Sequence, residues 1–123
     1  MPRDDLAARL LVALDEWDDF ALASVLNPDV RMVIDAGDET GADLRGRARV
    51  IRVLRQRLAT HPDASLHAVH VNGAPGLALR RFDGMVIGVL SIGLDLGGSI
   101  DELWLSTAPG KLAHWNRRRP AVH

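Results

Sequence analysis

Three ionisable side chains near the ends of predicted strands could take part in acid–base chemistry, and the first of them is Asp35. It closes an apolar segment, VRMVIDA at positions 30–36. A carboxylate that faces an apolar pocket has a raised pKa, which suits it to abstract a proton near neutral pH. The alternative is that Asp35 caps the loop that follows, because Asp-x-Gly sequences commonly form such turns.

His70 is the second candidate, at the end of a strand predicted over residues 64–71. It lies three residues after His67, so the two rings point to opposite faces of a strand and do not make a two-histidine metal site. His70 shares its face with Leu66 and Ala68, which makes it a candidate inward-facing acid–base or ligand-binding group. A satisfied core or surface histidine is the alternative. The chain has no cysteine, and we expect neither a metal nor a cofactor.

Asp95 is the third candidate, and it flanks the last predicted hairpin together with Asp101 and Glu102. A carboxylate in this position is a candidate acid–base group. The alternative is structural: Asp95 caps the turn, and Glu102 makes an exposed ion pair across neighbouring strands.

Four large apolar side chains are predicted to line a ligand pocket beside these groups, namely Trp17, Met32, Leu90 and Trp104. Trp17 also fits the core of a helix pair, and Trp104 could instead be buried in a subunit interface. We therefore expect a homodimer formed through the sheet face, and a small apolar ligand in the pocket.

Charge and composition exclude other partners. The net charge is −1, and the arginines of the segment 45–57 form a loose polar face without aromatic neighbours, with Arg57 at the edge of the apolar stripe. We expect this face to pair with the acidic junction at 15–19 rather than with nucleic acid. Acidic residues within the first 17 positions fit neither a signal peptide nor a membrane span, so we expect a cytoplasmic protein.

The elements that must position these groups follow from hydrophobic periodicity and turn residues. Helical stripes, strand patterns and glycine turns divide the 123 residues into a helix at 6–17, a short helix at 20–26, a strand at 30–36, a polar loop at 37–46, a helix at 46–60, a strand at 64–71, three meander strands separated at Asp83-Gly84 and Gly97-Gly98, and a helical turn at 111–115. This order predicts an α+β domain with three N-terminal helices on one face of a curved antiparallel or mixed sheet. We expect one domain over 1–123, ordered from about 5 to 115, with a basic tail at 116–123.

Several stretches resemble the SnoaL-like C-terminal extension of extracytoplasmic-function sigma factors, within the nuclear transport factor 2-like superfamily. They are LLVALDEWDDFALASVLNPDV (10–30), DAGDETG (35–41), VNGAPGLALRR (71–81), GSIDELWLS (98–106) and APGKLAHW (108–115). Their order and spacing cover nearly the whole chain. The resemblance implies a cone-shaped fold, with a cavity between the helices and the curved sheet.

The resemblance also frames two functions. One is a small-molecule-binding or protein-interaction module with a regulatory role, as in the sigma factors. The other is a cofactor-free cyclase, isomerase or hydrolase that uses Asp35 with His70 or Asp95; Asp35 lies near the position of the general base in ketosteroid isomerase-like members. The chain has no tyrosine, whereas the isomerase builds its oxyanion hole with one, so we do not expect a copy of that enzyme.

Overall fold

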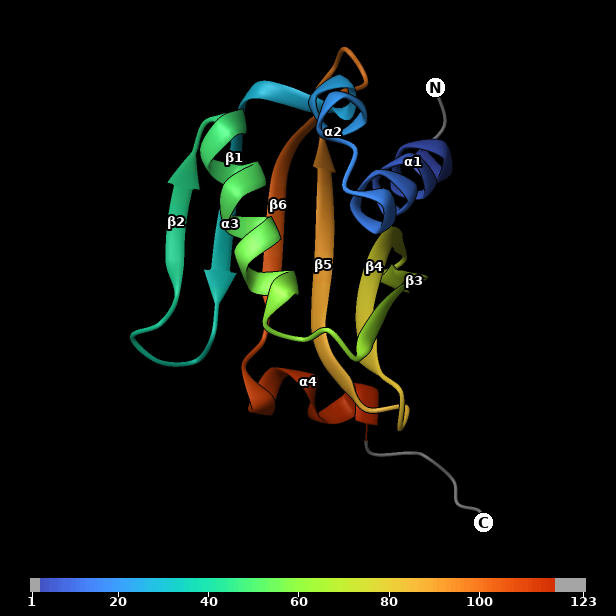
Figure 1. Ribbon diagram of the computed structural model, residues 1–123, viewed down its shortest axis with the longest axis vertical. Coiled ribbons are helices and arrows are strands. Elements are labelled where there is room, and N and C mark those ends of the chain that lie inside the picture. Colours follow the sequence, from blue (N-terminus) through green and yellow to red (C-terminus); the bar gives the residue numbers. More distant parts are fainter. Residues whose placement is uncertain (1–2, 117–123) are drawn as a thin grey trace.

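The computed structural model describes residues 3–116 of the chain. Four helices and six strands follow one another within this range (Figure 1). Their bounds, in chain order, are α1 Arg3–Glu16, α2 Asp19–Val25, β1 Leu26–Asp35, β2 Ala42–Arg45, α3 Arg47–Ala59, β3 Ala64–Val71, β4 Ala74–Arg81, β5 Val86–Leu94, β6 Ile100–Ser106 and α4 Pro109–Asn116.

All of these strands belong to one sheet, in the order β2-β1-β6-β5-β4-β3. β1 runs parallel to β6, and every other neighbouring pair is antiparallel. Gly73 and Gly84 make the two turns of the β3-β4-β5 meander, with φ angles of +83° and +91°, a region that glycine adopts without strain. The mixed sheet and its helices confirm the predicted α+β class.

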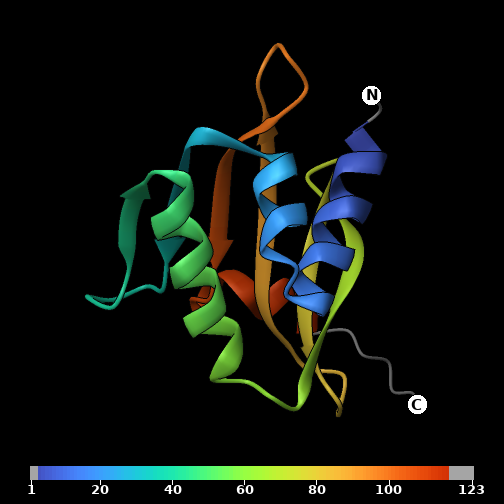
Figure 2. The ribbon, with the colours of Figure 1, turned by 45° about the horizontal axis from the view of Figure 1, so that its top comes forward.

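Helices α1, α2 and α3 cover one face of the sheet, which we call the inner face (Figure 2). The register places Leu77, Leu90, Leu105 and Ile34 in one row across four neighbouring strands. Each of these side chains is at most 9% exposed, and together with Leu10 of α1 they belong to the main hydrophobic core. The apolar stripes predicted on the two long helices therefore face this core.

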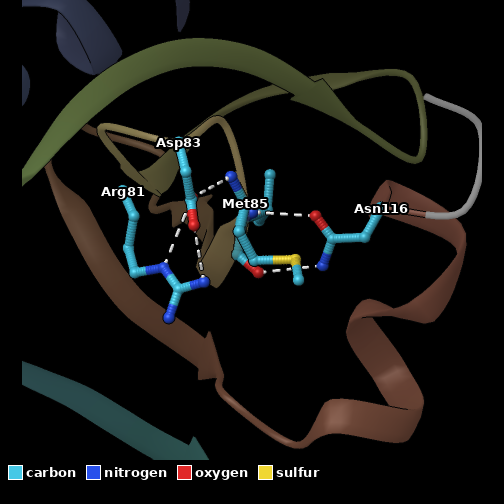
Figure 3. Close-up of polar contacts among 5 residues, drawn as sticks. Arg81, Asp83, Met85 and Asn116 are labelled. Carbon is cyan, nitrogen blue, oxygen red and sulfur yellow. Dashed lines mark hydrogen bonds and ion pairs between the residues drawn. The ribbon is translucent and has the colours of Figure 1, made fainter. Parts of the chain in front are cut away.

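The opposite face, which we call the outer face, is crossed by α4 (Figure 2). Leu112 of α4 is buried in a second, smaller cluster with Ala78, Val86 and Val89. At the helix end, the side-chain amide of Asn116 donates to the Val86 carbonyl at 3.0 Å and accepts from the Val86 N–H at 2.8 Å (Figure 3). Because this amide satisfies both backbone groups of Val86, as a peptide of a neighbouring strand would, it anchors α4 to β5.

The turn between β4 and β5 is ordered by its own polar contacts beside this anchor (Figure 3). Arg81 Nη2 lies 2.9 Å from Asp83 Oδ2, and Asp83 Oδ1 accepts a hydrogen bond from the Met85 N–H at 2.9 Å. Phe82 stands on this turn with 86% of its surface exposed.

Three elements differ from the sequence-based expectations. The segment predicted as a polar loop contains β2, an edge strand of four residues. β1 begins at Leu26 instead of Val30, and a register shift between Leu26 and Arg31 accommodates Pro28. α4 spans eight residues rather than one turn. The predicted tail overlaps α4 at Asn116 and otherwise lies outside the described residues.

The longest described helix, α1, has 14 residues, and no helix of the described range is long and apolar enough to cross a bilayer.

Candidate functional site

A cavity of about 140 Å³ lies between the helices and the inner face, and we call it the cone cavity. Most of its wall is leucine, contributed by α1, α3 and four strands. The lining residues are Leu14, Leu54, Arg57, Leu58, Thr60, His61, Leu66, Leu77, Leu79, Gly88, Leu90, Leu105 and Thr107. The wall resembles that of a typical ligand pocket, which is mainly apolar with a few polar groups.

One position in the wall of the cone cavity has no side chain. Gly88 faces the cavity from β5, paired with Leu79 of β4. A Cβ placed on Gly88 would lie 3.6 Å from Leu105, 3.7 Å from Leu79 and 3.8 Å from Thr107, which are ordinary contact distances. The glycine is therefore not required by crowding, and its effect is to leave space.

One end of the cone cavity is polar and cationic. Arg57, in the last turn of α3, lines it together with Thr60 and His61 from the turn that follows. The guanidinium donates one hydrogen bond from Nη2 to the Thr40 carbonyl at 2.9 Å. No Asp or Glu from the described part of the chain lines the cavity. The arrangement suits recognition of a small ligand rather than proton transfer between two acid–base groups.

A second depression, which we call the outer groove, lies on the outer face beside α4, with a volume of about 770 Å³. Trp104 stands in this groove with 42% of its surface exposed. Its neighbours on the adjacent strands are Ser91 of β5 and Val33 of β1. Ser91 and Gly93 contribute little bulk beside the indole, so the groove stays open between Trp104 and Trp115 of α4.

Asp35 lies at the end of β1 beside α4 and does not line the cone cavity. Its Oδ2 is 2.6 Å from Lys111 Nζ, and its Oδ1 accepts a hydrogen bond from the Gly37 N–H at 3.2 Å. These two bonds, the one from Lys111 above all, hold the pKa of Asp35 below its ordinary value. The expectation of a raised pKa in an apolar pocket was therefore wrong, because the carboxylate lies outside that pocket and caps a turn.

His70 and Asp95 also do not line the cone cavity. His70 is exposed near the end of the edge strand β3 and borders the outer groove. Asp95 begins the β5–β6 turn, where its Oδ1 accepts from the N–H groups of Gly97 and Ser99 at 2.8 and 2.9 Å. Its Oδ2 accepts from the side-chain amide of Asn27 at 2.8 Å. These bonds, with the one from Ser99 first, lower the pKa of Asp95.

The four predicted pocket residues are distributed over different sites. Leu90 lines the cone cavity, and Trp104 lines the outer groove on the other side of the sheet. Met32 is fully buried in the main core. Trp17 follows α1 with φ +50°, packs against the core, and has the Arg55 guanidinium 4.9 Å from its ring centroid.

Other charged side chains form ion pairs on the solvent-exposed surface. Arg55 of α3 lies 2.6 Å from Asp19, so the predicted pairing between the arginine face and the acidic junction is confirmed at this contact. Glu102 lies 3.3 Å from Arg31 of the neighbouring strand, which confirms the cross-strand ion pair. In residues 3–116, no three His, Asp or Glu side chains gather closely enough to hold a metal ion.

Sequence reasoning missed two residues that line the cone cavity: Arg57, which supplies its positive charge, and Gly88, which leaves space in its wall. Arg57 lies at the edge of an apolar helical stripe, which is the only signal in the sequence that it borders a buried region. Gly88 interrupts the apolar run VIGVL, and an isolated glycine inside a strand pattern marks a place where space or a close approach is needed.

Comparison with known proteins identifies the fold. The sequence matches no protein-family model, and the search of curated proteins gave no match. Among solved structures, the extracytoplasmic function sigma factor SigJ of Mycobacterium tuberculosis matches with a TM-score of 0.70 and 20% identity over 89% of this chain and 43% of that one. The chain thus spans less than half the length of that sigma factor.

Two further structures match over most of their own length. A candidate isomerase of the SnoaL-like family from Agrobacterium tumefaciens matches with a TM-score of 0.63 and 15% identity, over 85% of this chain and 95% of that one. An uncharacterised protein with a cystatin-like fold from Silicibacter pomeroyi matches with a TM-score of 0.62 and 20% identity, over 88% and 77% of the two chains. The chain therefore shares a cystatin-like fold with these structures.

Proposed function

We propose that this chain is a small-molecule-binding module whose ligand occupies the cone cavity. The observation that carries the proposal is an apolar cavity between the helices and the sheet with a single cationic, polar end. A binding module needs an apolar wall with few polar anchors. An enzyme needs at least two acid–base groups near one bound atom, and none of Asp35, His70 and Asp95 lines the cone cavity. The alternative of a cofactor-free cyclase, isomerase or hydrolase would need a different set of residues.

The role proposed for this binding is regulatory. A domain of this fold forms part of a sigma factor, which supports a cytoplasmic protein in which a bound ligand alters contacts with a protein partner. The candidate isomerase of the same fold supports the enzymatic alternative.

Toluene tests whether the cone cavity accepts a ligand. We expect a titration followed by methyl NMR to shift the leucine methyl signals that line the cavity, including those of Leu90 and Leu105. Gly88→Val places two methyl groups in the cavity and should abolish these shifts, whereas Gly110→Ala, on exposed α4 with open space around its Cβ, should leave them unchanged. Equal shifts in wild type and Gly88→Val would sink the proposal.

We also propose that the outer groove docks a second copy of the chain. The support is Trp104, a large apolar side chain that stays 42% exposed in an open groove, because aromatic side chains of this kind are enriched at interfaces. Light scattering at micromolar concentration should give a dimer mass for wild type and a monomer mass for Trp104→Ala. Phe20→Ala is the matched control, since Phe20 is 86% exposed on α2, away from the groove. A monomeric wild type would contradict this proposal.

A further inference from the structure

We propose that the cone cavity is selective for a small monocarboxylate with one ring or a short apolar chain, and that Arg57 holds its carboxylate. This inference rests on the proposed function and names the ligand class of the same cavity. Three features of the cavity support this proposal. They are its volume, the positive charge of Arg57 at its polar end, and the hydrogen bonds already made by the backbone carbonyls there.

The size limits the apolar part of the ligand. An apolar cavity of about 150 Å³ in a protein core accepts a benzene ring, and the cone cavity has about 140 Å³. One six-membered ring, or a chain of about six carbons, therefore fills it. Steroids and other fused-ring ligands exceed this volume, so they are excluded unless the helices move apart.

The charge balance selects the head group. Arg31, Arg55 and Arg81 each form an ion pair with a carboxylate on this chain. Arg57 forms none with any carboxylate in residues 3–116, and its guanidinium donates instead to the neutral Thr40 carbonyl. A guanidinium carries five N–H donors in a planar fork that matches a carboxylate. A half-buried cation at the end of an apolar cavity thus lacks an anion, and a ligand carboxylate supplies one.

The partial negative charge at the C-terminus of α3 disfavours a bound anion, but this repulsion is weakened by existing hydrogen bonds. A helix C-terminus carries a partial negative charge of about half an electron. Two of the carbonyls responsible are already occupied: that of Arg57 accepts from Thr60 Oγ at 2.7 Å, and that of Leu58 accepts from the His61 N–H at 3.1 Å. The full positive charge of Arg57 therefore dominates at this end.

Three probes of one shape and different charge test the inference: benzoate, benzyl alcohol and benzylamine. Dissociation constants come from NMR titrations of the cavity leucine methyls at low salt. We expect benzoate to bind about tenfold more tightly than benzyl alcohol, the ratio expected for one charge-assisted bidentate contact. Benzylamine should bind more weakly than either, because Arg57 repels it.

Arg57→Gln should lower the affinity for benzoate about tenfold and leave that for benzyl alcohol unchanged. Arg57→Lys keeps the charge but loses the planar fork, so it should give an intermediate benzoate affinity. Arg52→Gln is the matched control, because Arg52 is exposed on the same helix and does not line the cavity.

The outcomes separate the two proposals. If benzyl alcohol binds as tightly as benzoate, or if Arg57→Gln and Arg52→Gln behave alike, the cavity binds ligands but the carboxylate class is wrong. If no probe and no toluene shifts the leucine methyls, both the ligand class and the small-molecule function are overturned.

Discussion

At the residue scale, the Asp95 carboxylate, which the sequence made a candidate for acid–base chemistry, accepts hydrogen bonds that order a turn. Two N–H groups of its own turn and the Asn27 amide all donate to its carboxylate. Asp35 is similar, since Lys111 and the Gly37 N–H hold it in a turn. Sequence alone places both acids at strand ends, where turn caps and catalytic groups share the same residue type, so only the contacts distinguish the two roles.

Asp95→Asn should lower the melting temperature by a few degrees at pH 7, because it weakens charge-assisted bonds to Ser99, Gly97 and Asn27. The folded pKa of Asp95 lies below the ordinary value of 3.8. Its stabilisation is therefore complete above the unfolded pKa and is lost as the pH falls through the folded pKa. The difference between variant and wild type should therefore shrink as the pH falls below 3.8 and through the folded pKa, measured by calorimetry at pH 7 and in acid.

Asp101→Asn serves as the control for this prediction, because Asp101 is exposed on the neighbouring strand β6. It should leave the melting temperature unchanged at both pH values. A difference for Asp95→Asn that persists undiminished in acid would show that the amide alters packing rather than charge.

At the scale of elements, α4 has one buried side chain, and its last residue is fixed to β5 by a side-chain amide. Leu112 is 4% exposed, and Asn116 fixes the helix end to Val86. Leu112→Ala should lower the free energy of unfolding by about 2–4 kcal/mol, the usual cost of removing a buried leucine. Urea denaturation measures this change, and Ala113→Ser on the exposed side of α4 should cost under about 0.5 kcal/mol. Equal losses for the two variants would mean that α4 does not pack as described.

The success of sequence reasoning differs between elements for physical reasons. β3 has the predicted bounds because turn residues flank a regular strand of eight residues. β2 was missed because four residues, ADLR, are too few to show a period, and its pairing with β1 depends on the curved sheet. The extent and face of α4 depend on the small cluster beneath it, whose other members come from β4 and β5.

At the scale of the whole molecule, two hydrophobic clusters of unequal size lie on opposite faces of one sheet. The main core joins α1, α2 and α3 to the sheet, while the smaller cluster beneath α4 has four buried members. The resemblance implied a cavity between the helices and the sheet, but most of its lining could not be predicted, because the wall combines residues as distant in sequence as Leu14 and Thr107. Arg57 and Gly88 acquire their roles only in that assembly.

Because the two clusters differ in size, we expect α4 to open locally at a lower free energy than the main core. Native-state hydrogen exchange in low urea should show α4 amides exchanging through a local opening that is insensitive to urea, because few buried contacts are broken. Amides of α1 and β5 should exchange only with the urea dependence of global unfolding. The same urea dependence for α4 and β5 would show that α4 unfolds with the main core.

The position of β6 has a consequence for how the chain is made. It is the last strand in sequence, yet it lies third in the sheet and alone joins β1 to β5. During synthesis the β1–β2 pair and the β3-β4-β5 meander emerge first, and each presents a bare edge where β6 will later pair. Neither half can bury its inner face fully until residues 100–106 have left the ribosome. The nascent protein thus passes through a stage with two open sheet edges, each of which can pair with another chain until β6 closes both.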